Sequence, residues 1–315
     1  MCKAMSTAVI QKTVLHSSTA AFVSGPLLIR ETVYGIVKRL DFFVQHIEAY
    51  RRRENLEPHE VRVLDVGCGT GVNLTIPLAN AGYSIAGLDF DPASIDRARQ
   101  LARGLKNVEF ICGSVESLQS QQPFHVIICS EVLEHFQEPV VFVRQLVSAL
   151  KERGLLLVTV PNGFGFFELD SVFWRILSRF PRLVNNLLYR WENLFWEIFG
   201  SSAILQRRKD EYRPDRLALT HSTLAPDLTH YQSFTRSKIT QLLQSQGCCV
   251  SEVRNNTFLA GNLLGLVVRE LDRFLAWNAR IADKLPGFLV SGWLIAAQKS
   301  TAIKERIHLR NWDAS

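Results

Sequence analysis

A glycine-rich loop and two acids near residue 65 are the residues whose types and spacing indicate chemistry most directly. An apolar run ends in Asp65, and three glycines follow it at alternate positions: Gly67, Gly69 and Gly71. Asp89 comes eighteen residues after the last glycine. A dinucleotide-binding loop has the spacing G-x-G-x-x-G, in which the third glycine opens a helix beneath a pyrophosphate. Val72 occupies that third position here. The spacing therefore favours a nucleoside ligand without a pyrophosphate.

Alternating strand and helix patterns must position these residues. Five apolar segments are typical of strands: residues 61–66, 83–88, 108–112, 125–129 and 155–160. Residues 33–47, before them, repeat apolar side chains with a helical period. Helical patterns also separate the strands, over 92–102 after an N-cap at Asp91 and over 139–150 before Gly154. This alternation predicts parallel strands with right-handed crossovers, covered on both faces.

Two later apolar segments, residues 248–253 and 293–298, would complete a sheet of seven strands. A helical pattern over 235–245 precedes the segment 248–253, and another over 263–281 precedes the segment 293–298. We therefore predict an α/β fold with a doubly wound, mostly parallel seven-stranded sheet and a helical insertion. The expected divisions are an N-terminal arm and helix over 1–59, a ligand-binding core over 60–162, an aromatic helical insertion over 163–230, and the rest of the sheet over 231–315, with a second helical insertion at about 255–292.

The candidate ligand residues follow the ends of the predicted strands. In an open parallel sheet, ligands bind outside the carboxyl ends of the strands. Asp89 ends the second strand, and the two oxygens of a carboxylate there match the vicinal hydroxyls of a ribose. Phe90 can cover an adenine face, and Ser114, after the third strand, lies where it can meet the adenine edge. Residues 130–135, after the fourth strand, would border the reactive end of the ligand.

Four ordered motifs resemble those of a known family. They are Leu64-Asp65-Val66-Gly67-Cys68-Gly69-Thr70-Gly71, the acidic Asp89, Ser130-Glu131-Val132-Leu133-Glu134-His135 and Leu155-Leu156-Leu157-Val158-Thr159-Val160-Pro161-Asn162. Together they are similar to the motifs of class I S-adenosylmethionine-dependent methyltransferases. The similarity is greatest to the subgroup of ubiquinone-biosynthesis O-methyltransferases and small-molecule methyltransferases. It covers roughly residues 60–162 and, more weakly, 228–299. The resemblance implies a Rossmann-like methyltransferase fold.

The resemblance also implies a cofactor, S-adenosylmethionine, and a set of contacts to it. Backbone around Gly67 and Gly69 would hold the methionine part, Asp89 the ribose, and Ser114 and Val115 the adenine. Family members often carry aspartate at the position of Ser114, where a serine hydroxyl can still accept a hydrogen bond. The expected cofactor contacts are Asp65, Gly67, Cys68, Gly69, Gly71, Asp89, Phe90, Ser114, Val115, Ser130 and Glu131.

Methyl transfer requires the protein to align a nucleophile with an already activated methyl group and to exclude water. A general base is needed only when the nucleophile is a weakly acidic hydroxyl. The candidates for this base are Glu131, His135 and His230. The alternative role of His135 is a polar cap on the helix after the fourth strand. No metal ligand set is expected.

Composition limits the class of protein. The chain has 315 residues, 47% of them hydrophobic, and a formal net charge of +6, which suits one sizeable core with insertions. Its six cysteines form no C-x-x-C pair and are interpreted as small buried hydrophobes, neither disulfides nor metal ligands. The sequence has no stretch of eighteen uncharged apolar residues and no signal-peptide pattern. We therefore expect a cytoplasmic protein.

Aromatic and arginine side chains are dense between residues 171 and 199. Several interpretations stay open: a lid that packs over a hydrophobic substrate, ordinary core between the insertion and the sheet, a peripheral membrane surface for anionic lipid, and a contact between subunits. The expected acceptor is a small molecule, or one linked to a lipid or sugar, with a partly apolar surface. Oligomeric state is not predicted.

We thus predict methyl transfer from S-adenosylmethionine, at a hydroxyl of such an acceptor. The net charge favours one alternative, a nucleic-acid methyltransferase. However, residues 129–132 are not the Asn/Asp-Pro-Pro-aromatic element that amino methylation of bases would use, so nucleic acid is not the expected partner. A nicotinamide oxidoreductase is opposed by Val72. The remaining alternative is a scaffold that binds the cofactor without turnover.

Overall fold

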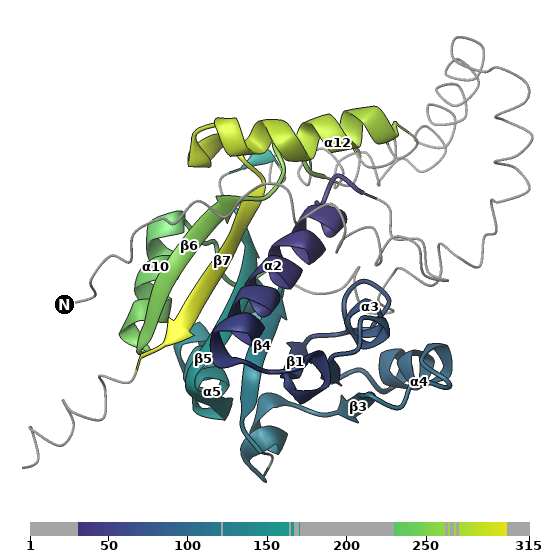
Figure 1. The fold of residues 1–315 in the computed structure, drawn as a ribbon. Coiled ribbons are helices and arrows are strands. Elements are labelled where there is room, and N and C mark those ends of the chain that lie inside the picture. Colours follow the sequence, from purple (N-terminus) through teal and green to yellow (C-terminus); the bar gives the residue numbers. More distant parts are fainter. Residues whose placement is uncertain are drawn as a thin grey trace, which may run out of the picture.

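A seven-stranded sheet forms the centre of the protein (Figure 1). The computed structural model describes residues 31–120, 122–163, 165–166, 170, 230–261, 264, 268 and 271–300. Within them the strand order is β3-β2-β1-β4-β5-β7-β6. The strands are β1 (Arg62–Val66), β2 (Ser84–Asp89), β3 (Val108–Cys112), β4 (Phe124–Ser130), β5 (Leu150–Pro161), β6 (Cys248–Asn255) and β7 (Gly292–Lys299).

The sheet is parallel except at one side. Strands β1 to β5 pair in parallel, whereas β7 pairs antiparallel with both β5 and β6. The predicted doubly wound, mostly parallel sheet of seven strands is confirmed. Its strand order reverses between β1 and β4, and such a switch point is where ligands bind in open α/β sheets.

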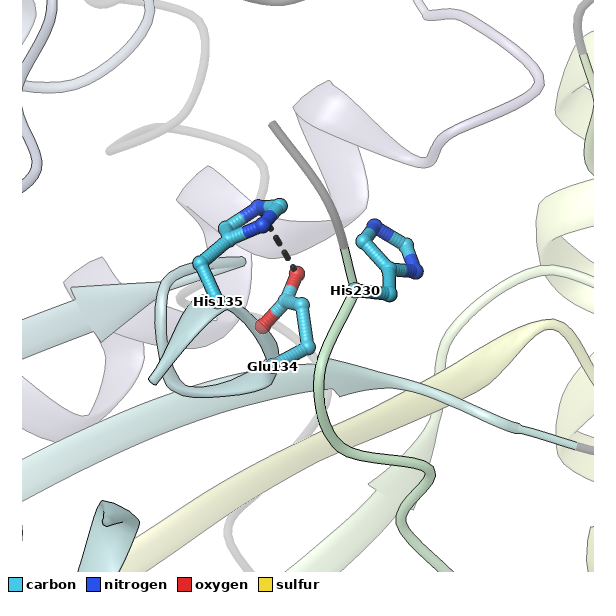
Figure 2. A group of neighbouring side chains, drawn as sticks. All are labelled: Glu134, His135 and His230. Carbon is cyan, nitrogen blue, oxygen red and sulfur yellow. Dashed lines mark ion pairs between the residues drawn. The ribbon is translucent and has the colours of Figure 1, made fainter. Parts of the chain in front are cut away.

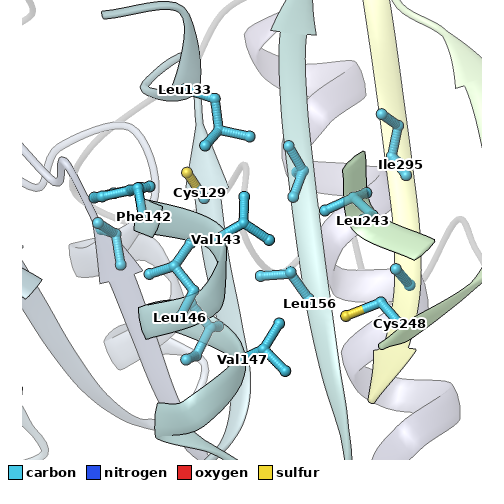
Figure 3. Close-up of a cluster of buried hydrophobic side chains, with 14 of the residues drawn as sticks. Cys129, Leu133, Phe142, Val143, Leu146, Val147, Leu156, Leu243, Cys248 and Ile295 are labelled. Carbon is cyan, nitrogen blue, oxygen red and sulfur yellow. The ribbon is translucent and has the colours of Figure 1, made fainter. Parts of the chain in front are cut away.

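One face of the sheet is covered by α5 (Pro139–Ala149) and α10 (Arg236–Ser245). Figure 3 shows how side chains from these helices meet those of β4, β5 and β7 in one apolar cluster. Leu146, Leu156 and Leu243 are fully buried there. Burying a side chain of this size stabilises the fold by roughly 1.5–3 kcal/mol, so this cluster anchors α5 and α10 to the sheet.

The opposite face is covered by α2 (Ile36–Glu54) and α3 (Thr75–Asn80). Phe43 and Ile47 of α2 and Leu78 of α3 are buried against alternate residues of the same strands. A third cluster joins α4 (Pro92–Leu101) to β3 through Ile95 and Phe110. The sheet is therefore covered on both faces, as the strand and helix alternation predicted.

Helix α2 begins later and ends later than the predicted span of 33–47. Its start is fixed by Gly35, which has a φ of 71°, and by the Glu31 carboxylate, which accepts the N–H groups of Val37 and Lys38. The last turn carries no apolar period, but Arg51 pairs with Glu48 at 3.0 Å. Side-chain pairs three residues apart support a helix in this way.

The predicted N-cap at Asp91 is confirmed, and Thr235 caps a second helix in the same way. The Asp91 carboxylate accepts the N–H groups of Ala93 and Ser94 at the start of α4, and the Thr235 hydroxyl accepts that of Lys238 at the start of α10. The remaining described helices are α12 (Asp272–Ile281) and the 3₁₀ turns η1 (Pro58–Glu60), η2 (Val115–Ser120), η3 (Leu133–His135), η4 (Ala282–Lys284) and η5 (Gly287–Leu289).

The cysteines correct one expectation. All five that the structure describes are free, but Cys112 is exposed, and Cys68 and Cys249 are half-buried. Only Cys129 and Cys248 are buried. Cys112 differs because it ends β3, which has a neighbouring strand on one side only.

Several expectations fall on residues 1–30 and 171–229, which lie outside the described residues. They concern most of the N-terminal arm and the aromatic segment 171–199, and the divisions at 59, 162 and 230 stay predictions. Across the described part of the chain, no helix combines the length and the apolar character needed to cross a membrane.

Candidate active site

The structure brings the predicted ligand residues to one edge of the sheet. Asp65, Asp89 and Ser130 come at or near the ends of β1, β2 and β4, which lie side by side as β2-β1-β4. Because these strands are parallel, their carboxyl ends share that edge. Glu131 follows directly after β4, so cofactor and base candidates from three separate stretches of sequence lie together.

The glycine loop adopts a conformation that favours glycine at each of its three positions. The φ angles of Gly67, Gly69 and Gly71 are 73°, 53° and 72°, in the left-handed region where a Cβ atom is strained. A Cβ added to Gly67 would overlap Cγ2 of Val132, and one added to Gly71 would lie 3.0 Å from the Phe110 ring. A Cβ on Gly69 would meet no atom within 4 Å. Gly69 therefore faces open space, as a loop that admits a ligand must.

Asp89 is tied to the loop before any ligand binds. Its Oδ2 accepts the N–H of Gly69 at 2.8 Å, and its Oδ1 accepts the N–H of Asp91 at 2.9 Å. A carboxylate oxygen can accept more than one hydrogen bond, so both oxygens keep capacity for ribose hydroxyls. Phe90 stands beside it with 60% of its surface exposed. An aromatic ring exposed to this extent is available to cover a base.

Asp65 lies beneath the loop and not on its surface. It is 3% exposed, and its Oδ2 accepts the hydroxyl of Thr75 at 2.6 Å. Burial raises the pKa of Asp65 to about 7, with a smaller contribution from the charge of Asp89. Desolvation disfavours the ionised carboxyl, so Asp65 keeps its proton up to neutral pH. Direct contact with the cofactor stays a prediction for this residue.

The predicted adenine side is divided between surface and core. Ser114 is exposed, and Val115 is 5% exposed and belongs to the apolar cluster beneath α5. Ser114 also forms a hydrogen bond to Glu116, which lowers the pKa of that glutamate. The Cys112 thiol lies 3.9 Å from the carbonyl oxygen of Phe90. The residues after β2 and β3 thus form one neighbourhood, as the sequence predicted.

The end of β4 carries a backbone outlier and a polar network. Glu131 has a φ of 56°, and its Oε1 accepts the hydroxyl of Thr159 at 2.8 Å. Ser130 Oγ lies 2.9 Å from the Thr159 hydroxyl and accepts a hydrogen bond from Arg39 at 3.3 Å. Nη1 of Arg39 is also 3.8 Å from Oε1 of Glu131. The guanidinium of Arg39 and the carboxylate of Glu131 therefore lie together at the carboxyl ends of the parallel strands, which we call the ligand edge.

Figure 2 shows a second polar group, formed by Glu134, His135 and His230. It lies near the network, because the charge of Glu131 acts on both Glu134 and His230. The backbone carbonyl of Glu134 accepts the N–H of Tyr231 at 2.8 Å, which fixes the returning chain against η3. The rings of His135 and His230 are 5.0 Å apart between centroids, and His135 Nε2 is 3.9 Å from Glu134 Oε1. Two residues almost a hundred positions apart in sequence thus meet at one place.

The charge states of this group follow from its burial. Glu134 is 1% exposed, and desolvation and the charge of Glu131 raise the pKa of Glu134 well above its ordinary value. The His230 side chain is at the surface, yet partial desolvation lowers its pKa. The raised pKa favours the protonated form of Glu134, and the lowered pKa favours the neutral form of His230. A neutral imidazole can accept a proton.

Comparison with known proteins identifies the family. Residues 37–253 match the family described as methyltransferase domain, which is more than half of the chain. The chain belongs to this methyltransferase family. The family assignment agrees with the four sequence motifs, which resemble those of class I methyltransferases, and S-adenosylmethionine is the cofactor of that class.

Individual relatives cover a smaller part. The chain is 31% identical over 126 residues to the ubiquinone biosynthesis O-methyltransferase of Rickettsia felis, covering 39% of this chain and 49% of the relative. It is 36% identical over 126 residues to the mitochondrial enzyme of the same name from Schizosaccharomyces pombe, covering 38% and 43%. The chain thus spans about half the length, or less, of these relatives. A solved structure of a sarcosine dimethylglycine methyltransferase from Galdieria sulphuraria, itself so far unproven in function, is 12% identical with a TM-score of 0.48, covering 91% of this chain and 98% of that one.

Sequence reasoning missed two residues of this methyltransferase's candidate site. Arg39 lies on α2, outside the motifs, and only the fold brings it to Ser130 and Glu131. Thr159 lies in an apolar run, and its polar side chain among aliphatic neighbours was the one signal that could have marked it. Buried polar side chains need partners, and Thr159 finds them in Ser130 and Glu131.

The group of Glu134, His135 and His230 also fits a cation, which the sequence did not indicate. One donor atom from each residue lies within 4.8 Å of the others, and the buried Oε2 of Glu134 has no hydrogen-bond partner among the residues that the structure describes. Carboxylate and imidazole are common ligands of divalent metals. A divalent cation held there would lower the pKa of a neighbouring hydroxyl.

Proposed function

We propose that this methyltransferase transfers the methyl group of S-adenosylmethionine to a hydroxyl of a small, partly apolar molecule. The observation that carries the proposal is the contact between the glycine loop and the segment that holds the acid and base candidates. Val132, in the middle of that segment, packs against Gly67 so closely that no side chain fits between them. Groups that can accept a proton therefore stand beside the backbone that receives the cofactor.

The cofactor end of the site supports this proposal. Asp89 and Gly69 would take the ribose and the methionine part, and Phe90 would cover the adenine. The methionine part is a zwitterion, with one carboxylate and one ammonium group. Arg39 and Glu131 present the complementary charges 3.8 Å apart. We infer that Arg39 pairs with the carboxylate and Glu131 with the ammonium, and this role for Glu131 is preferred over that of general base.

The two imidazoles are then the base candidates that remain. As the acceptor oxygen attacks the methyl group, an O–C bond forms and the S–C bond breaks, which leaves neutral S-adenosylhomocysteine. The hydroxyl proton passes to the imidazole of His230 or His135 and from there to water. The lowered pKa of His230 favours its neutral form, and its side chain reaches solvent, so it suits both steps. The buried Glu134 carboxyl lies beside the pair, with its Oε1 3.9 Å from Nε2 of His135.

The nature of the acceptor rests on the neighbourhood of these histidines. Tyr231, directly after His230, is 54% exposed. Apolar surface beside the base favours an acceptor with an aromatic or aliphatic part. The names of the relatives, ubiquinone biosynthesis O-methyltransferases, support an oxygen acceptor. A lipid-linked acceptor and membrane contact through 171–199 remain within the proposal.

The test uses methyl-labelled S-adenosylmethionine and extract separated into aqueous, lipid and nucleic-acid pools. We expect label in an aqueous or lipid product, and turnover at least tenfold lower in His230→Asn or His135→Asn. His59→Asn is the matched control, because His59 is exposed and lies in η1, before β1, at the other edge of the sheet. Label in the nucleic-acid pool alone, or no label in any pool, would refute the proposal. Repeating the assay after chelation, with and without added magnesium or zinc, separates metal-assisted from metal-free transfer.

A further inference from the structure

Glu131 is held in a backbone conformation that an ordinary side chain avoids. Its φ of 56° lies in the left-handed region, where non-glycine residues persist only if their surroundings fix them. Asn55 and Arg153 share this property among the described residues. Asn55 ends α2 and Arg153 lies outside the ligand edge, on the N-terminal half of β5. Glu131 alone of the three borders the site.

Thr159 fixes Glu131 at two points. The backbone carbonyl of Thr159 accepts the N–H of Glu131 at 3.1 Å, and its hydroxyl donates to Oε1 at 2.8 Å. Thr159 is fully buried in β5, between β4 and β7 in the sheet, so it cannot move to follow a mobile partner. The strained turn and the carboxylate are thus set by one rigid residue.

The hydrogen bonds of this network all point the same way. The Thr159 hydroxyl has one proton, and that proton goes to Glu131. The Ser130 hydroxyl must therefore donate to Thr159 and accept from Arg39, at 2.9 Å and 3.3 Å. Donors run in order from Arg39 through Ser130 and Thr159 to the carboxylate. Each bond in such a chain polarises the next, which strengthens the hydrogen bond that the Thr159 hydroxyl donates to Oε1 of Glu131.

We propose that Thr159 is a positioning residue for cofactor binding, which holds the Glu131 carboxylate in place for the ammonium group of S-adenosylmethionine. The inference rests on the proposed function through the assignment of Glu131 to that ammonium. The carboxylate side chain is one-third exposed, so it reaches the ligand while Thr159 stays buried behind it. The left-handed backbone conformation of Glu131 is unfavourable by itself, but it directs the carboxylate toward the proposed cofactor site.

The test compares two ligands by titration calorimetry. S-adenosylhomocysteine carries the ammonium group, and 5′-methylthioadenosine lacks the whole amino-acid end. Thr159→Val keeps the shape of the side chain and removes the hydroxyl. We expect it to weaken S-adenosylhomocysteine about tenfold, the effect of losing one hydrogen bond to a charged group, and to leave 5′-methylthioadenosine within about twofold. Thr159→Ser should restore the first affinity.

Two further comparisons separate positioning from damage to the fold. Thr257→Val also removes a fully buried hydroxyl that donates to a backbone carbonyl, that of Val33, at 2.8 Å, and should leave both affinities unchanged. In a Glu131→Gln background, Thr159→Val should cost no further affinity, because residues that act through one another are not additive. If Thr159→Val does not fold, Thr159→Cys replaces it, with the same expectation.

The measured affinities of the Thr159 variants either support or overturn the proposed role of Thr159. Equal weakening of both ligands, unchanged affinity for S-adenosylhomocysteine, or additive effects of the two substitutions would overturn the role of Thr159. None of these results depends on turnover. Failure of the proposed function is seen separately, as wild-type protein that binds S-adenosylhomocysteine and transfers no label.

Discussion

Asp65 should make the stability of the fold depend on pH in a direction opposite to that of most carboxyl groups. Its pKa is raised from 3.8 to about 7, chiefly by burial. The unfolded chain loses this proton above about pH 4, whereas the native protein keeps it to about pH 7. Since the native state then binds more protons, its stability falls as pH rises through that interval. About three pKa units, at roughly 1.4 kcal/mol each, amount to about 4 kcal/mol.

Asp65→Asn isolates this contribution, because asparagine is nearly the same size and its carbonyl can still accept the Thr75 hydroxyl. The assay is urea unfolding of both proteins between pH 5 and pH 8. We expect the variant to gain stability relative to wild type by about 3 kcal/mol across that range. Asp96→Asn, at an exposed position of α4, should show no such trend. A difference between Asp65→Asn and wild type that stays constant with pH would mean that Asp65 is ionised in the native protein, and the reasoning would fail.

Three more results are expected. Gly67→Ala should lower the melting temperature, because its Cβ would overlap Val132. Gly69→Ala, whose Cβ would meet no atom within 4 Å, should lose affinity for S-adenosylhomocysteine with a smaller change in melting temperature. A larger drop in melting temperature for Gly69→Ala than for Gly67→Ala would contradict the placement of the loop. Phe90→Ala should leave stability within about 0.5 kcal/mol and weaken the same ligand about tenfold by calorimetry, and unchanged binding would remove Phe90 from the site. Iodoacetamide should alkylate Cys112 before the two buried cysteines and more slowly with ligand bound, as mass spectrometry of the peptides can establish.

Most strands could be predicted from sequence because they form short apolar runs, and β1, β2, β4 and β7 are buried along most of their length. Residues 108–112 were predicted as a strand and form β3 without change, and the other strands agree within two residues at most ends. The exception is β5, which begins at Leu150 and not at residue 155. Leu150 pairs with Phe124 of β4, and the register then shifts before Leu155 pairs with Val126. The residues between them include the polar Lys151-Glu152-Arg153, which gave no apolar pattern from which a strand could be predicted.

The candidate site could be predicted only where function coincides with the end of a strand. Asp89 and Glu131 follow apolar runs, so their positions in the sequence already place them at the ligand edge. Arg39 has the surroundings of any polar residue on an amphipathic helix, and its role depends on how α2 crosses the sheet. The exposure of Cys112 likewise depends on strand order, because β3 is an edge strand. Such properties are tertiary, and no local pattern contains them.

The position of β7 in the sheet affects how the protein folds while the ribosome synthesises it. This strand lies between β5 and β6, and β6 pairs with no other strand. The ribosome makes residues 292–299 last among the seven strands, so the open edge of β5 waits unpaired while more than a hundred residues are added. Unpaired strand edges invite aggregation. A nascent chain stalled before residue 292 would therefore need a chaperone to cover that edge, although every residue of the cofactor loop has already been made.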